Sequence, residues 1–190
     1  MKLTHRPKSH TIYKGRRYKV NLQFDNVLRI FALQKEKELS RLDKIDLTAE
    51  LLLGKTKLSI WDKAQIIEQI FKTEVSQGRG GAKQKSFDFT QDAGSIYASF
   101  WQAYRIDLHT ADLHWEQFMA LFEGLPQDTA IKEIISIRLK PIPKATKHNG
   151  EEIKALMEAK ALYALTYDKD EARQSFQHDL ERFAAMVKGK

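Results

Sequence analysis

Apolar side chains recur every three or four residues through most of the chain, in short segments that glycine, proline or capping residues separate. This spacing places the apolar side chains of a segment on one face of an α-helix, and that face must be buried against other elements. The chain contains no cysteine, so neither disulfides nor thiolate metal sites can stabilise it. We therefore predict an all-α or mostly α domain with about seven to eight helices, held together by packing.

Capping signals mark the helices expected in the first half of the chain. Asp25 is the predicted N-cap of one helix, and a second helix is expected to run from about Asp46 to Gly54. Ser59 and Asp62 have the spacing of a capping box before a third helix with strong apolar periodicity. All three helices are expected to face the core.

The second half of the chain carries a dense set of aromatic side chains at helical spacing, and these are expected to build much of the core. One helix is predicted to begin at a cap formed by Thr110 and to end at Gly124. The next helix is predicted to have Pro126 at its first position and to end before Pro141 and Pro143. The candidate core anchors are large aromatic side chains at apolar helix positions: Phe31, Tyr97, Phe100, Trp101, Trp115, Phe118 and Phe122.

A short β-hairpin is predicted at the N-terminus, over residues 11–22. Lys14 and Gly15 form its turn, and apolar residues including Tyr18 and Val20 alternate along its second strand. An isolated two-stranded hairpin is marginally stable in water. The hairpin is therefore expected either to pack on helices or to pair with a strand of another chain.

Two polar connections suggest how the chain is organised. Residues 1–139 are predicted to form the main helical domain, including the hairpin and a mobile glycine-rich linker near residues 77–86. Residues 150–190 are predicted to form a pair of C-terminal helices packed on that domain. The first of the pair is expected to run to about Tyr167, and Asp168 is expected to cap the second.

Charge is distributed unevenly along the chain. The net charge is +7, and the segment Met1 to Val20 has seven basic residues and no acid, whereas Ser86 to Ala130 has seven acids and one arginine. The two segments could attract one another within one molecule or between copies, or each could simply be solvated. The candidate self-association residues, chosen by charge from these segments, are Arg16, Arg17, Lys19, Asp107, Asp112 and Glu116.

No constellation in the sequence supports catalysis. The glycine-rich stretch through Gly81 lacks the Gly-Lys-Ser/Thr ending of a phosphate-binding loop, and Gly94-Ser95 lies inside a helical pattern rather than at a strand-to-helix turn. His109 and His114 are five residues apart, whereas two metal ligands on one helical face are three or four apart. We expect a protein that is not an enzyme and has no catalytic residues, no metal and no cofactor.

Nucleic acid and membranes are not expected as partners. The aromatic-rich segment is acidic and would repel phosphate, so only the basic N-terminal segment could hold nucleic acid. No apolar run approaches the roughly 20 residues that span a bilayer, and the polar stretch Met1 to His10 lacks the apolar region of a signal peptide. We expect a cytoplasmic protein.

Two stretches of the sequence resemble a known family. They are Ile12 to Ala32, IYKGRRYKVNLQFDNVLRIFA, and Phe87 to Arg138, which includes FDFTQDAGSIYASFWQAYRIDL and LHWEQFMALFEGLP. Both are similar to a family of phage proteins from Gram-positive hosts, encoded just before the tape-measure gene. In the family pattern an aspartate begins the aromatic helix, as Asp92 does here. The chain departs from the pattern at Arg105, where the family has glycine, and at Glu116, where it often has tryptophan.

The resemblance implies a tail-assembly chaperone. Such a protein is all-helical and non-catalytic, binds the tape-measure protein in the host bacterial cytoplasm while tail-tube subunits polymerise, and is absent from the virion. The tail-tube protein is a possible second partner, and related chaperones form spiral homo-oligomers. Two alternatives stay open: a minor structural tail protein that remains in the virion, and an accessory protein that binds nucleic acid.

Overall fold

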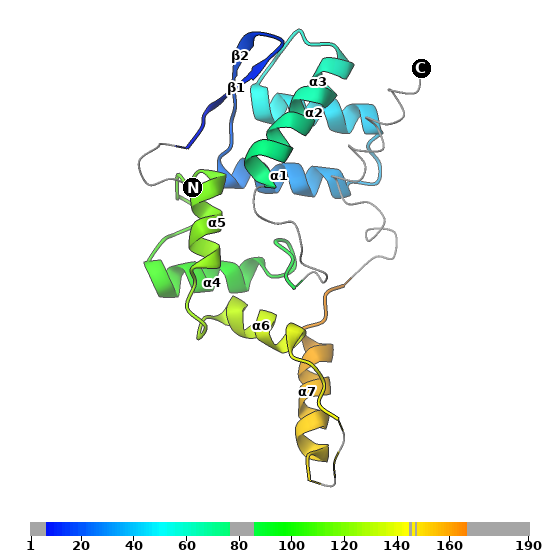
Figure 1. Ribbon diagram of the computed structural model, residues 1–190, viewed down its shortest axis with the longest axis vertical. Helices are drawn as coiled ribbons and strands as arrows, with labels where there is room; N and C mark the ends of the chain where they lie inside the picture. The colour runs from blue at the N-terminus through cyan, green and yellow to red at the C-terminus, as the bar shows by residue number, and fades with distance from the viewer. Residues whose placement is uncertain (1–6, 77–85, 145, 147, 167–190) are drawn as a thin grey trace. The chain divides into compact units, whose positions relative to one another are not determined.

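A computed structural model describes residues 7–76, 86–144, 146 and 148–166 (Figure 1). Within these residues it contains a two-stranded sheet, seven α-helices and a short π-helix, which confirms the predicted fold class. In chain order the elements are β1 (His10–Tyr13), β2 (Arg16–Lys19), α1 (Phe24–Lys35), α2 (Arg41–Leu53), α3 (Ile60–Ile70), η1 (Phe71–Val75), α4 (Ala93–Tyr104), α5 (Trp115–Glu123), α6 (Ala130–Leu139) and α7 (Gly150–Leu162).

The described residues form two compact units. The first comprises residues 7–76 and 112–120, and the second comprises the described residues of 86–111 and 121–166, so that the division falls within α5. The predicted domain boundary between residues 139 and 150 stays a prediction. Most of the predicted linker and the predicted last helix lie outside the described residues.

The N-terminal hairpin forms as predicted, with shorter strands. β1 and β2 are antiparallel, and Tyr13 pairs with Arg16 across a two-residue turn. Both turn residues have positive φ, 48° at Lys14 and 74° at Gly15, as a type I′ turn requires. Val20 lies beyond β2 and is buried, and its N–H donates to the Ser9 carbonyl at 2.8 Å.

The starts of the first two helices differ from the prediction. α1 begins at Phe24 with Gln23 as its N-cap, so Asp25 lies in the first turn and is not the cap. α2 begins at Arg41, five residues before the predicted start, because Ser40 and Asp43 form a capping box ahead of the apolar residues. Its predicted end at Gly54 is confirmed, and that glycine has a φ of 71°.

α3 begins as the sequence indicates and then widens. The Ser59 hydroxyl accepts from the Asp62 N–H at 3.1 Å, which confirms Ser59 as the N-cap. After Ile70 the chain continues as the π-helix η1, in which Phe71 and Val75 are buried. Apolar periodicity is similar for both helix types, so the change in winding was not predicted.

The core of the first unit contains most of its largest apolar side chains. Trp115 is 1% exposed, and its ring centroid lies 5.6 Å from that of Phe31 in an edge-on arrangement and 5.7 Å from that of Phe118 in a stacked one. The Phe118 ring also stacks on Phe24 at 4.8 Å. Isoleucines from α1 and α3, among them Ile30 and Ile67, complete this core.

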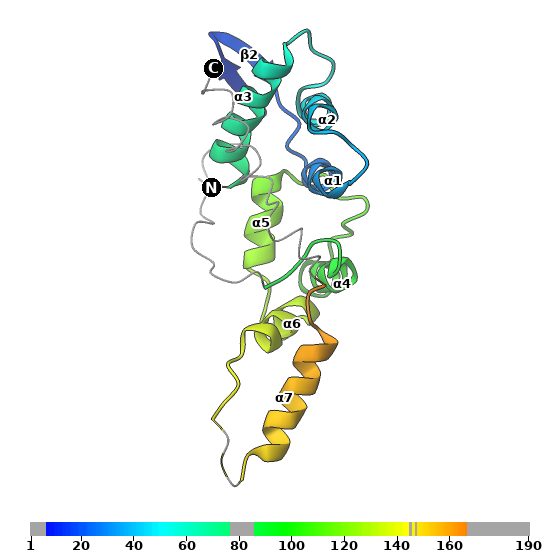
Figure 2. The same ribbon diagram turned by 90° about the vertical axis from the view of Figure 1, so that its right-hand side faces the viewer.

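The second unit is built from α4, α6, α7 and the end of α5. Phe100 and Ile131 are fully buried, and the Ser99 hydroxyl accepts from the Ile131 N–H at 3.1 Å near the start of α6. α6 packs on both α4 and α7. The views in Figures 1 and 2 agree that α7 runs back beside residues 140–144, which follow α6.

Three of the predicted helix boundaries in this region are wrong. α5 starts at Trp115, so Thr110 is not its cap. Thr110 lies instead in a turn formed with Asp107. α6 starts at Ala130, and Pro126 instead accepts from the N–H and the hydroxyl of Thr129 in the preceding turn. α7 ends at Leu162 rather than near residue 167. The predicted ends at Gly124 and before Pro141 are confirmed.

Candidate interaction surfaces

The three cations predicted for self-association lie on β2. Arg16, Arg17 and Lys19 are exposed, and among the described residues no carboxylate forms an ion pair with any of them. Two other cations of the basic segment do have such partners. The Lys8 ammonium lies 2.9 Å from Glu74, and the Lys14 ammonium lies 2.6 Å from Asp62.

Asp62 connects the hairpin turn to the start of α3. Its carboxylate accepts from the Lys14 ammonium, from the Tyr13 hydroxyl at 3.0 Å and from the Ser59 hydroxyl at 2.9 Å. These hydrogen bonds, the one from Lys14 first, lower the pKa of Asp62. The turn is therefore fixed to the helix by both charge and hydrogen bonding.

The three predicted acidic contact residues are divided between the two units. Asp107 belongs to the second unit, whereas Asp112 and Glu116 belong to the first. The pKa of Tyr97 is raised, first by burial and second by the negative charge of Asp107. The Asp112 carboxylate accepts a hydrogen bond from the Gln23 side-chain amide. No ion pair joins these acids to the β2 cations in the described part of the chain. The attraction between the basic and acidic segments, within one molecule or between copies, stays a prediction.

His114 is a titratable side chain of the first unit whose pKa is shifted by burial. Its ring Nε2 lies 3.2 Å from the Lys8 carbonyl, and its Nδ1 accepts from the Glu116 N–H at 3.2 Å. Burial lowers the pKa of His114, and the hydrogen bond to the Lys8 carbonyl only partly opposes this effect.

The lowered pKa of His114 predicts loss of stability in mild acid. The unfolded chain takes up the proton first as the pH falls below about 6.5, so the free energy of unfolding falls through this range until the folded form is also protonated. Urea titrations at pH 7.5 and 5.5 measure the difference. His114→Gln is expected to reduce the pH dependence, and His148→Gln, at an exposed site, serves as its control. An equal pH dependence in wild type and His114→Gln contradicts this assignment.

The candidate core anchors divide into three groups. Phe100, Trp115, Phe118 and Phe122 are buried, as predicted. Phe31 and Tyr97 are half-buried, and the Phe31 ring lies against Phe71 and Trp115. Trp101 is 46% exposed, so the prediction that it anchors the core is wrong. Successive helical residues point about 100° apart, and Phe100 takes the position that faces the core.

A buried ion pair that was not predicted lies at the start of α4. Asp92 and Arg138 have side chains only 5% and 8% exposed, and they form two parallel hydrogen bonds of 2.6 and 2.8 Å. The Arg138 guanidinium also donates to the Ser86 carbonyl at 3.1 Å and to the Tyr163 carbonyl at 2.6 Å. The Asp92 carboxylate accepts in addition from the Asp88 N–H.

This ion pair joins parts of the second unit that are far apart in the sequence: the segment before α4, the end of α6 and the end of α7. A planar guanidinium suits such a site because it can bond a carboxylate on one edge and carbonyls on the others. The pair spans 46 residues, and no local sequence pattern indicates it.

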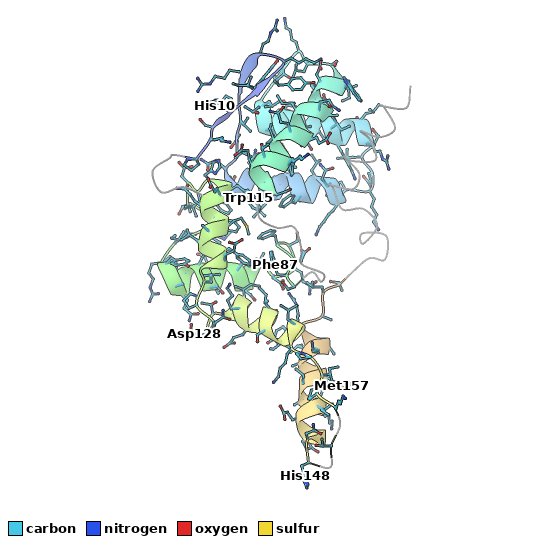
Figure 3. The ribbon with its side chains drawn as sticks, viewed as in Figure 1. His10, Phe87, Trp115, Asp128, His148 and Met157 are labelled. Carbon is cyan, nitrogen blue, oxygen red and sulfur yellow. The ribbon has the colours of Figure 1, made fainter. Side chains whose placement is uncertain are left out.

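The second unit also exposes apolar surface. Besides Trp101, four of its large apolar side chains are about half exposed or more: Leu139, Ile142, Met157 and Leu162. Figure 3 shows Met157 on α7, a helix in which Leu156 is the buried residue. An open groove of about 460 Å³ lies along α6, with Ile135 and Leu139 as its apolar lining and Lys132 and Lys140 as its basic lining.

Neither a metal-binding cluster nor a membrane-spanning helix is found in the described part of the chain. No group of three or more histidine, aspartate or glutamate side chains among those residues is placed to hold a metal ion. Among the described helices, none has the length and apolar character needed to cross a bilayer.

Comparison with known proteins identifies a family. The family model described as Bacteriophage Gp15 protein matches residues 8–165, which include every helix and strand described above. No curated protein and no solved structure matches the chain. Because the match covers most of the sequence, the chain belongs to the Bacteriophage Gp15 protein family.

Proposed function

We propose that this phage protein is a tail-assembly chaperone that binds the tape-measure protein during tail morphogenesis, without catalysing a reaction. Membership of a phage family and the resemblance of residues 11–138 to proteins encoded before the tape-measure gene support the proposal. The structural observation that carries it is the exposed apolar surface of the second unit, which includes the groove along α6.

The groove along α6 has the chemistry needed to bind an amphipathic helix. Leu139, 49% exposed, and Ile135 would contact the apolar face of such a helix, while Lys132 and Lys140 would lie near its acidic side chains. Contiguous apolar surface on a folded protein commonly marks a contact with a partner, and Ile135 and Leu139 line this groove together. Long helical proteins such as tape-measure proteins have many such faces, and covering them would prevent their aggregation.

Co-expression with the adjacent tape-measure protein tests the proposal. Wild-type chain is expected to co-purify with the tape-measure protein and keep it in the supernatant. Leu139→Glu is expected to reduce the recovered tape-measure protein several-fold, because a carboxylate would enter the apolar contact. Leu42→Glu is the matched control, since Leu42 is 54% exposed on α2 of the first unit. Failure of the wild-type chain to bind or solubilise the tape-measure protein contradicts the proposal.

Self-association in the host cytoplasm is the second part of the proposal. The β2 cations of one copy, Arg16, Arg17 and Lys19, would contact the acidic segment of the next, through residues such as Asp107 and Asp112. Because the two contact surfaces differ, the contact is head-to-tail and can repeat along a spiral. The tail-tube protein is proposed as a further partner during polymerisation.

Self-association through charge predicts salt-dependent size. Light scattering at about 25 mM salt is expected to give a larger mass than at 500 mM, because the Debye length falls severalfold over this range. Reversing the charge of Arg16, Arg17 and Lys19 together is expected to abolish the difference. An unchanged mass at both salt concentrations contradicts the electrostatic contact.

Mass spectrometry of purified virions separates a chaperone, which is absent from them, from a retained tail protein, which is present at fixed copy number.

A further inference from the structure

One edge of the N-terminal hairpin is occupied by the fold. The side-chain amide of Gln69, on α3, donates to the Ile12 carbonyl at 3.0 Å and to the Thr11 hydroxyl at 2.9 Å. The hairpin is held further by the ion pairs of Lys8 with Glu74 on η1 and of Lys14 with Asp62 on α3. The outward Ile12 carbonyl of β1 is thus bonded to α3.

The outer edge of β2 is open. In an antiparallel pair, alternate residues direct their N–H and C=O groups away from the partner strand. The Tyr13–Arg16 pair flanks the turn, so the register makes Arg17 and Lys19 the outward residues of β2. In the described part of the chain, no group forms a hydrogen bond with the main-chain N–H or C=O of either residue.

The open edge carries positive charge. Arg17 and Lys19 are two residues apart, so their side chains lie on the same face of the hairpin, and Ile12 on this face is 64% exposed. Neither cation forms an ion pair with a described carboxylate. Cations on an edge strand discourage pairing with the same strand of another copy, because like charges would then face one another. An acidic strand would meet no such repulsion.

We propose that the outer edge of β2 binds an extended acidic peptide segment, which adds to the hairpin as a third strand. Main-chain hydrogen bonds to Arg17 and Lys19 supply the pairing, and carboxylates at alternate positions of the segment lie beside their side chains. The fixed hairpin needs no reordering to accept the strand. The inference stands on the hairpin alone and does not depend on the chaperone function.

A synthetic peptide tests this site on the full chain. The probe is a fluorescent seven-residue peptide, Thr-Glu-Val-Glu-Val-Glu-Thr, followed by anisotropy at low salt. A second peptide of the same sequence carries N-methyl groups on its pairing edge, so that it keeps its charge and loses its hydrogen-bond donors. The first peptide is expected to bind and to slow hydrogen exchange of the Arg17 and Lys19 amides, and the methylated peptide is expected to do neither.

Charge-neutralising variants test the role of the two cations. Arg17→Gln with Lys19→Gln is expected to weaken binding about five- to tenfold. Lys144→Gln with Lys154→Gln removes the same charge from exposed sites of the second unit and is expected to leave binding unchanged. Circular dichroism checks that both double variants fold.

Four results would overturn the inference. They are absence of peptide binding to wild type, equal binding of the methylated peptide, equal weakening by the control variant, and binding of a thymine oligonucleotide in place of the peptide. The last result would make the edge a nucleic-acid site, and its affinity would fall steeply with salt. None of these results bears on capture of the tape-measure protein by α6, which the co-expression experiment measures.

Discussion

Replacing Arg138 by methionine is expected to unfold the second unit under conditions in which the first unit stays folded. The substitution leaves the Asp92 carboxylate buried without its cation and removes the hydrogen bonds to the Ser86 and Tyr163 carbonyls. Breaking a buried ion pair by removing one partner costs about 3 to 5 kcal/mol, which is a large share of the stability of a small unit. Hydrogen exchange followed by mass spectrometry would show increased exchange in α4 and α6.

A matched pair of variants separates the unpaired charge from the loss of packing. Asp92→Leu together with Arg138→Met removes both charges, and this double variant is expected to recover much of the stability lost in Arg138→Met. Arg29→Gln breaks an exposed ion pair with Asp25 on α1 and is expected to cost less than about 1 kcal/mol. A loss in Arg138→Met no larger than that of Arg29→Gln would show that the buried pair does not stabilise the unit.

Truncating Trp115 to alanine is expected to cost about 3 to 5 kcal/mol of the free energy of unfolding of the first unit. The indole is 1% exposed, lies against Phe31 and Phe118, and donates from Nε1 to the Val75 carbonyl at 3.3 Å. Alanine would leave a large cavity and a buried carbonyl without its donor. Urea denaturation monitored by circular dichroism measures the change.

Trp101→Ala is the matched control for Trp115→Ala. The two substitutions remove the same atoms, but Trp101 is 46% exposed and buries less apolar area, so its loss is expected to cost clearly less stability than the loss of Trp115. Because tryptophans at protein surfaces often dominate binding, Trp101→Ala is a further variant for the co-expression experiment. Equal destabilisation by the two variants would contradict the difference in burial on which this prediction rests.

The sequence alone determined the fold class and several helix ends. The Ser59 cap, the Gly54 and Gly124 ends and the Lys14-Gly15 turn are local signals, and each is present in the structure. These features depend on a few neighbouring residues and on backbone conformation, which a sequence reports directly. Lys14, Gly15 and Gly124 also lie within the two stretches that carry the family resemblance.

Only the tertiary structure determined which side chains and main-chain groups are exposed to solvent. Phe100 and Trp101 are adjacent and equally apolar in sequence, and only the packing of α4 determines which one faces solvent. The Asp92–Arg138 pair and the difference between the two hairpin edges depend on segments distant in the chain. α6 brings the arginine to Asp92, and Gln69 of α3 bonds the outward Ile12 carbonyl of β1. The charge of the N-terminal segment marked Arg17 and Lys19 as contact candidates. That their main-chain groups point outward follows from the register in which β1 and β2 pair, which residue composition does not specify.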